Sequence, residues 1–380
     1  MYVIPAKAGN QEFHSLTYWL DTRFRGYDDF TGSSFVKGMH MQENVAASDA
    51  TKELFDHYAH KIQQIKAEIA KVVIGQDEMI SLMIHTLLSK GHILLEGVPG
   101  LAKSLAVETF AKVIGGDFKR FQFTPDKMPS DVTGTMVWNE KDRKFEFFFG
   151  PIFCNIFLAD EINRASPKVQ SALLQAMQEK EVTVECMRYD IPHPFMVLAT
   201  ENPIEQIGTY PLAEAQVDRF MVKYDVGYPL KDEEFELIKR KNTTFDQLKA
   251  DVKSVLALEE ITAIQQLIHD RVRVSRNVMN FILNICTATR PRDTYAAQEF
   301  NADIHQYIRL GASPRASEFL LALAKAFAFS QHRDYVDFDD ITACAPHVLR
   351  HRILLNSTAL SQQISTDMLV REILKMIEPY

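Results

Sequence analysis

The chain has 380 residues, of which 46% are hydrophobic and 24% are charged, and its formal net charge is −8. This length is enough for two domains with cores of their own, and the composition is that of an ordinary globular protein. A negative overall charge repels nucleic acid, so binding to DNA or RNA would need a local basic channel. The cysteines show no zinc-ligand spacing, which favours reduced thiols in the cytoplasm; they are Cys154, Cys186, Cys286 and Cys344.

The chain lacks the sequence signs of membrane insertion and of export. No apolar stretch is long enough to predict a transmembrane helix. No apolar segment of signal-peptide length follows Met1. We therefore expect a cytoplasmic protein without a membrane span.

Residues 1–40 have neither helical nor strand periodicity, and they resemble the translated form of a palindromic repeat found in many bacterial genomes. We expect them to form an N-terminal extension outside the folded domains. Translation would then begin at Met39 or Met41 rather than at Met1. The alternative interpretation is a genuine flexible arm.

The spacing of apolar residues predicts an α/β domain over 41–228. Helical spacing predicts one helix over 52–73 and another over 79–88. Short apolar runs that alternate with helical segments predict strands at 92–96, 118–123, 155–159, 195–200 and 221–226. This alternation is typical of a parallel sheet covered on both faces. Two β-hairpins are predicted as insertions, at 135–149 and 182–191.

The character of the sequence changes after Tyr228-Pro229. Amphipathic helical patterns predominate there, and strand signals are few. We expect a domain boundary near 228 and a second, helical domain over 229–380.

A glycine-rich turn follows the predicted strand 92–96 and precedes a predicted helix. It reads Gly97-Val98-Pro99-Gly100-Leu101-Ala102-Lys103-Ser104. Such a turn presents backbone N–H groups and a helix N-terminus to the phosphates of a nucleotide. Lys103 adds a positive charge for the outer phosphates, and the Ser104 hydroxyl can bind Mg²⁺. The turn departs from the usual pattern at Ala102, where glycine normally precedes the lysine.

Polar residues follow two further predicted strands. Asp160 and Glu161 end the run 155–161, and Asn202 follows the run 195–200. In a phosphate-loop protein such an aspartate serves Mg²⁺, and the adjacent glutamate polarises the attacking water. Because ligands bind at the carboxyl ends of parallel strands, Asn202 is expected at the same edge, where its amide could orient that water.

Arg219 directly precedes the last predicted strand. An arginine at this position can reach the γ-phosphate bound to a neighbouring subunit. Arginine fingers supplied in this way accelerate phosphoryl transfer by about 10³- to 10⁵-fold. The sequence therefore predicts that catalysis requires assembly.

Taken together, these runs resemble the AAA+ ATPases and, within them, the MoxR family, over residues 50–380. The family pattern has alanine before the lysine, which accounts for Ala102. Five further stretches carry the resemblance: Phe121-Gln122-Phe123-Thr124-Pro125-Asp126, Pro129-Ser130-Asp131-Val132-Thr133-Gly134, Asp160-Glu161-Ile162-Asn163-Arg164-Ala165, Glu214-Ala215-Gln216-Val217-Asp218-Arg219-Phe220 and Gly311-Ala312-Ser313-Pro314-Arg315-Ala316.

The resemblance implies an AAA+ P-loop NTPase core with a five-stranded parallel sheet in the order 5-1-4-3-2 and a C-terminal all-α lid domain. It implies that Asn202 is the first sensor, Arg219 the arginine finger and Arg315 the second sensor, in the lid. The adenine would be lined by Val73, Ile74, Gly75 and Gln76. The hairpin at 135–149 would be an insertion that faces a central pore.

The resemblance also implies ATP and Mg²⁺ as ligands, a homo-oligomeric ring of six subunits and chaperone-like remodelling or activation of a client protein complex. A protein with a von Willebrand factor A domain would be its partner. The alternatives are a nucleic-acid motor on the same core and a nucleotide-dependent switch. The negative charge and the pair Glu161 and Arg219 favour the remodelling ATPase over both.

Overall fold

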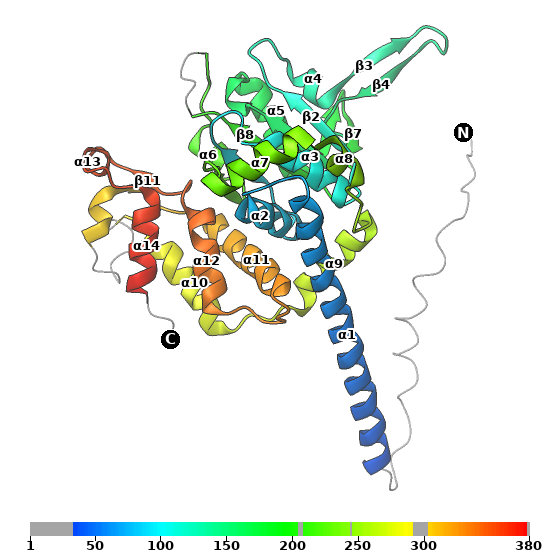
Figure 1. The fold of residues 1–380 in the computed structure, drawn as a ribbon, viewed down its shortest axis with the longest axis vertical. Coiled ribbons are helices and arrows are strands. Elements are labelled where there is room, and N and C mark those ends of the chain that lie inside the picture. The colour runs from blue at the N-terminus through cyan, green and yellow to red at the C-terminus, as the bar shows by residue number, and fades with distance from the viewer. Residues whose placement is uncertain (1–32, 204–207, 244, 292–302, 378–380) are drawn as a thin grey trace, which may run out of the picture. The chain divides into compact units, whose positions relative to one another are not determined.

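A computed structural model describes residues 33–203, 208–243, 245–291 and 303–377 of the chain (Figure 1). The chain divides into two units, Met1–Glu53 and Leu54–Tyr380, and the second holds the part of the first helix from Leu54 on and every later element. The first helix, α1, runs over Ser33–Ala70 and contains most of the helix predicted over 52–73. Of the predicted extension over 1–40, residues 1–32 lie outside the described residues, and residues 33–40, for which no helix is predicted, form the start of α1.

Five parallel strands form the central sheet, in the order β2-β5-β8-β1-β9. Counted along the chain, this is the order 5-1-4-3-2, so the predicted topology is confirmed. Each strand lies within one residue of its predicted ends. The bounds are β1 Ile93–Glu96, β2 Phe118–Gln122, β5 Ile156–Asp160, β8 Met196–Glu201 and β9 Val222–Asp225.

Helices cover the sheet on both faces, so successive residues of each inner strand enter two different apolar clusters. Leu95 and Leu158 belong to the cluster that contains α2 and α3. Leu94 and Phe157 belong to the cluster that contains α5. The bounds of these helices are α2 Asp77–Leu88, α3 Lys103–Val113 and α5 Pro167–Glu179.

Two antiparallel hairpins are inserted between the sheet strands, as predicted. They pair β3 Gly134–Asn139 with β4 Lys144–Phe149, and β6 Glu181–Val184 with β7 Met187–Asp190. The turn of the second hairpin has no glycine. Glu185 and Cys186 nevertheless take φ values of +47° and +68°, the left-handed conformation that a type I′ turn requires at both central positions.

The remaining elements are mostly helical, and they include one pair of short antiparallel strands, β10 and β11, that the sequence did not predict. Gly311 lets the chain enter α11 beside Thr289, because a Cβ at Gly311 would lie 2.3 Å from the Thr289 carbonyl oxygen. The bounds are α4 Pro129–Thr133, η1 Ile162–Arg164, α6 Glu214–Val217, α7 Lys231–Thr243, α8 Phe245–Asp251, α9 Leu258–Arg271, α10 Arg276–Ala288, η3 Asp303–Tyr307, β10 Ile308–Leu310, α11 Pro314–Ser330, α12 Phe338–Leu349, β11 Leu354–Leu355, α13 Ser357–Ser361 and α14 Thr366–Met376.

Helices α7 and α8 follow the boundary predicted at 228, yet they contact the α/β part of the chain. Lys112 on α3 donates to the carbonyl oxygens of Lys249 and Ala250, at 2.9 and 3.2 Å. The backbone N–H of Val255 donates to the Val113 carbonyl at 2.7 Å. The division at 228 therefore stays a prediction. In the described part of the chain, no helix is long and apolar enough to cross a membrane.

Candidate active site

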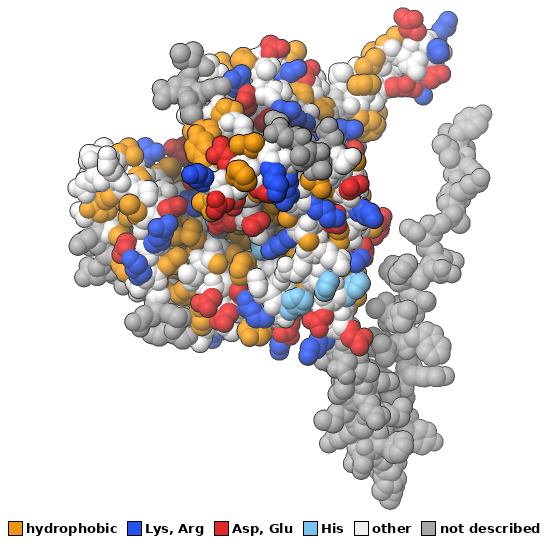
Figure 2. All heavy atoms as spheres, in the orientation of Figure 1, with side chains coloured by type: hydrophobic (Ala, Val, Ile, Leu, Met, Phe, Trp, Pro, Cys, Tyr) orange, Lys and Arg blue, Asp and Glu red, His pale blue; other side chains and the backbone are white. Residues whose placement is uncertain are grey.

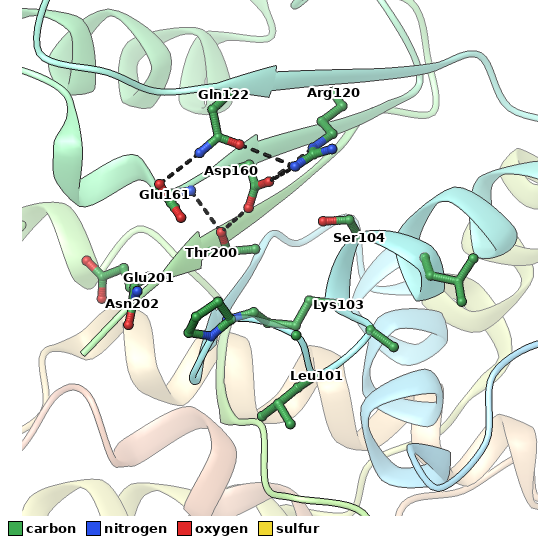
Figure 3. Close-up of a pocket in the computed structure, with 14 residues that line it drawn as sticks. Leu101, Lys103, Ser104, Arg120, Gln122, Asp160, Glu161, Thr200, Glu201 and Asn202 are labelled. Atoms are coloured by element: carbon green, nitrogen blue, oxygen red, sulfur yellow. Dashed lines mark hydrogen bonds and ion pairs between the residues drawn. The ribbon is translucent and has the colours of Figure 1, made fainter. Parts of the chain in front are cut away.

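A cavity of about 320 Å³ lies where β1, β5 and β8 end and α3 begins (Figure 3). The predicted phosphate loop, the acidic pair and Asn202 meet there, together with residues from the neighbouring strand β2. The lining residues are Pro99, Gly100, Leu101, Ala102, Lys103, Ser104, Leu105, Arg120, Gln122, Asp160, Glu161, Thr200, Glu201 and Asn202.

The loop between β1 and α3 has the backbone geometry of an anion cradle. Gly100 takes φ +90°, and no neighbouring atom lies within 4 Å of the position where its Cβ would be. Ala102 takes φ +57° as the N-cap of α3, so it adopts the left-handed conformation for which glycine is usual. The N–H groups of the first turn of α3 have no partners within the helix, and they favour an anion.

Lys103 lies at the start of α3, and its ammonium group donates to the Gly97 carbonyl across the loop. Burial lowers the pKa of Lys103, whereas the carboxylates of Asp160, Glu161 and Glu96 raise it. The Ser104 hydroxyl points into the cavity (Figure 3). A cation and a hydroxyl thus lie beside the anion cradle.

Asp160 is held on both of its oxygens. Arg120 on β2 donates to Oδ2 from Nε and Nη2, at 3.0 and 2.6 Å. The Thr200 hydroxyl donates to Oδ1 at 2.7 Å and accepts a hydrogen bond from the backbone N–H of Glu161 at 2.8 Å. The buried Thr200 therefore orients both members of the acidic pair (Figure 3).

Glu161 takes φ +56°, which turns the chain sharply after β5. Its carboxylate accepts a hydrogen bond from Gln122 Nε2 at 2.8 Å and pairs with Arg164 Nε at 2.9 Å. The carboxylate is thereby held at the wall of the cavity formed by the edge strand β2.

Glu201 ends β8 and Asn202 follows it, and both line the remaining wall of the cavity. Asn202 is buried and lines the cavity, as predicted from its place after the strand. Burial raises the pKa of Glu201 to about 7; Glu96 also raises this pKa, while Lys223, which itself pairs with Glu96, lowers it. Glu201 is therefore an acid that titrates near neutral pH.

Gly97 and Val98, which begin the predicted phosphate loop, do not line this cavity, and neither do three further predicted groups. Arg219 lies in the turn after α6. Arg315 Nη1 pairs with Asp218 Oδ2 at 3.1 Å. The segment Val73, Ile74, Gly75 and Gln76 precedes α2, and a Cβ at Gly75 would lie 2.4 Å from a carboxylate oxygen of Glu233 on α7.

Apart from Leu105, which follows the phosphate loop on α3, sequence reasoning missed four lining residues: Arg120, Gln122, Thr200 and Glu201. Two signals could have found them. Arg120 and Gln122 alternate along the strand that flanks β5, so they share one face with each other. Thr200 and Glu201 directly precede Asn202 on a strand that was already predicted to end at the site.

The donor set fits Mg²⁺. In the described residues, no group of three or more His, Cys, Asp or Glu side chains could hold a metal ion by itself. Ser104 and Asp160 nevertheless supply one hydroxyl and one carboxylate on the same cavity. Mg²⁺ at nucleotide sites is held by such a small protein set, together with substrate phosphates and water.

Comparisons with known proteins agree with this geometry. Residues 92–222 match the ATPase family associated with various cellular activities (AAA), and residues 301–373 match the AAA lid domain. The chain is 42% identical over 318 residues to the chaperone MoxR1 of Mycobacterium tuberculosis, which covers 84% of this chain and 82% of that protein. It is 43% identical over 312 residues to YeaC, an uncharacterized protein of Bacillus subtilis, over 82% of this chain and 92% of YeaC.

A solved structure is also similar. The crystal structure of an ATPase candidate from Cytophaga hutchinsonii superposes with a TM-score of 0.81 at 41% sequence identity. The match covers 89% of this chain and 99% of that one. The α/β sheet and the helical part of the chain are therefore found together in a known structure.

We expect Thr200→Val to lower the rate of nucleotide hydrolysis by about 10- to 100-fold, as loss of a partner that orients a ligand commonly does. The substitution removes the hydroxyl that orients Asp160 and the Glu161 backbone. Affinity for a fluorescent nucleotide analogue should change little. Thr86→Val on α2 is the matched control, because its buried hydroxyl has no partner among the described residues. Equal rates for wild type and Thr200→Val would contradict this role.

We expect Glu201→Gln to stabilise the protein more at pH 8 than at pH 5. The folded-state pKa of about 7 lies above the ordinary value of 4.5, so wild-type stability falls as pH rises from 4.5 through 7. The glutamine amide of the variant does not titrate, so the variant does not lose stability in this way as pH rises. Urea unfolding at both pH values measures the difference, with the exposed Glu179→Gln on α5 as the control. An equal effect at both pH values would show that Glu201 is not the titrating group.

Proposed function

We propose that this chain, which belongs to the MoxR family of AAA+ ATPases, uses ATP hydrolysis to remodel, assemble or activate a client protein complex. The observation that carries the proposal is that the phosphate loop, Asp160 and Glu161 meet in one cavity. The chain is an ATP hydrolase, and its relative in Mycobacterium tuberculosis is named as a chaperone. The coupling to a client is the step that this proposal adds.

We assign a role to each end of the phosphate loop. Backbone N–H groups of Gly100 to Lys103 and the N-terminus of α3 bind the phosphates, and Lys103 neutralises the outer ones. Ser104 and Asp160 would hold Mg²⁺, which when bound neutralises charge on the phosphates. The Lys103 ammonium donates to the Gly97 carbonyl and has two further N–H groups for the phosphates.

Glu161 is the group that polarises the attacking water. Its carboxylate lies on the cavity wall beside Asp160, and the Thr200 hydroxyl orients its backbone. Asn202, which follows the adjacent strand β8, orients the same water. The strands β5 and β8 are neighbours in the sheet, so the two residues approach the phosphates from one edge.

Arg219 and Arg315 complete sites from outside this cavity. Arg219 acts on nucleotide bound to a neighbouring subunit, because it does not line the cavity of its own subunit. Arg315 acts on nucleotide of its own subunit from the start of α11, in the lid. The segment Val73 to Gln76 lines the adenine. These roles require a ring, for which six copies are the number expected in this family.

The hairpin of β3 and β4 is the part of the surface that we assign to the client. Trp138 and Phe145 are 49% and 61% exposed on it, an unusual position for large apolar side chains. Figure 2 shows charged side chains gathered at its tip. A protein with a von Willebrand factor A domain would be the cytoplasmic partner of the assembly.

A test of remodelling has two measurements, one with a heat-denatured protein and one with duplex DNA. We expect the wild-type ring to suppress aggregation of a heat-denatured model protein in an ATP-dependent manner, and Glu161→Gln to bind ATP without doing so. Duplex DNA should leave the ATPase rate unchanged, because Lys and Arg lie interspersed with Asp and Glu on the face in view (Figure 2). Stimulation by DNA alone would favour a nucleic-acid motor instead.

Mixing two inactive variants tests the action of Arg219 across subunits. Arg219→Ala keeps an intact phosphate loop, and Lys103→Ala keeps an intact finger. Mixed rings should regain part of the ATPase activity, because some interfaces pair an intact loop with an intact arginine. Light scattering confirms that mixed rings form. A monomer that hydrolyses ATP at full rate at every protein concentration would rule out this arrangement.

A further inference from the structure

The turn that carries Arg219 is stabilised mainly by residues outside α6 and β9, the helix and strand that flank it. It comprises residues 218–221, between the four-residue helix α6 and the start of β9. The backbone N–H of Arg219 donates to Gln216 within the short helix at 3.2 Å. A helix of one turn holds little by itself, so the direction of Arg219 depends on contacts made by its neighbours.

Arg352, which follows α12, supplies most of those contacts. Its Nη2 donates to the backbone carbonyls of Asp218 and Phe220, at 2.9 and 2.6 Å. Its Nη1 donates to the Met221 carbonyl at 3.3 Å, and its Nε donates to Asp218 Oδ1 at 2.8 Å. One guanidinium thus binds the carbonyl before Arg219 and both carbonyls after it.

The environment of Arg352 keeps it in this position. Its side chain is 1% exposed, and its guanidinium lies 5.2 Å from the ring centre of Phe319 on α11. Burial lowers the pKa of Arg352 to about 10, against the opposing effect of Asp218, so the group remains charged at neutral pH. Loss of these partners would leave a buried charge unpaired and destabilise the folded protein, which favours keeping the contacts.

The other hydrogen-bond donors to the Asp218 carboxylate also come from the helical part of the chain. The Ser313 hydroxyl, at the start of α11, donates to both carboxylate oxygens at 3.1 Å. Arg315 Nη1 donates to Oδ2 at 3.1 Å. On the neighbouring short helix α6, Glu214 pairs with Arg309 at 3.1 Å. The turn is therefore fastened to the lid on several sides.

We propose that Arg352 is a positioning residue for Arg219, which it aims at the neighbouring subunit by binding the backbone on both sides of it. The inference rests on the proposed role of Arg219 as a finger that acts across the subunit interface. Arginine suits the task because its planar group offers five N–H donors in fixed directions. A lysine in its place has a single nitrogen and cannot bind the carboxylate and three carbonyls in this geometry.

The test separates the subunit that donates the finger from the subunit that hydrolyses ATP. Glu161→Gln subunits bind ATP without hydrolysing it and serve as finger donors. Arg219→Ala subunits have an intact phosphate loop and serve as acceptors. In mixed rings, ATP hydrolysis then occurs at acceptor sites that a donor completes. Arg352→Lys is added to the donor in one mixture and to the acceptor in another.

We expect Arg352→Lys in the donor to lower the rate of the mixed rings by about 10- to 100-fold, the range that a misplaced catalytic group produces. The same substitution in the acceptor should leave the rate within twofold, since the acceptor offers no finger. A residue that merely stabilises the fold would lower the rate in both placements. Arg333→Lys in the donor is the matched control, because Arg333 pairs with the buried Asp340 within the lid.

Each remaining result decides the question. Equal losses in both placements, or no loss in either, would overturn the positioning role. An inactive mixture without any change at Arg352 would overturn the proposed action across subunits, and this inference with it. If Arg352→Lys fails to form rings, Arg352→Gln, which keeps a planar donor, replaces it. Failure of both to assemble would count against the proposal, which requires assembled rings with a misdirected finger.

Discussion

The sheet is covered by helices on both faces, so its inner strands can expose polar side chains only where they end. Leu94 and Leu95 on β1 enter opposite apolar clusters, as do Phe157 and Leu158 on β5. At the carboxyl end of β5, Asp160 finds Thr200 on the adjacent strand and Arg120 on the other side. The register of a buried parallel sheet thereby decides which polar groups meet, and the active site follows from it.

The same constraint explains what could be predicted from the sequence. Continuous apolar runs mark the buried strands, and the polar residue that follows each run marks the site. Asp160, Glu161 and Asn202 were found in this way. Gln122 and Thr200 were not, because their contribution depends on which strands are neighbours, and the order of strands in the sheet came from family resemblance. The contact between Arg352 and Asp218 joins residues 134 positions apart in the chain. The spacing of apolar residues in the sequence carries no signal for such a contact.

Two departures from the usual residue pattern show that the backbone conformation is kept where the residue changes. Ala102 occupies a left-handed position in the phosphate loop, and Cys186 with Glu185 does so in a tight hairpin turn. A residue with a Cβ atom is less stable in the left-handed conformation by about 1 kcal/mol or more. The surrounding strands and helix hold the conformation in each case. Glycine is thus preferred at such positions, but it is not required.

Asp218 binds two of the arginines that lie outside the cavity. Its carboxylate faces two guanidiniums, those of Arg315 and Arg352. On the proposed roles, Arg315 has a second anionic partner, and where its Nη1 turns to a phosphate the bond to Asp218 is lost. Asp218 then has a single cationic partner, and a carboxylate shared by fewer cations binds the remaining one more strongly. Nucleotide in one subunit would therefore tighten the anchor of the arginine that this subunit offers to its neighbour.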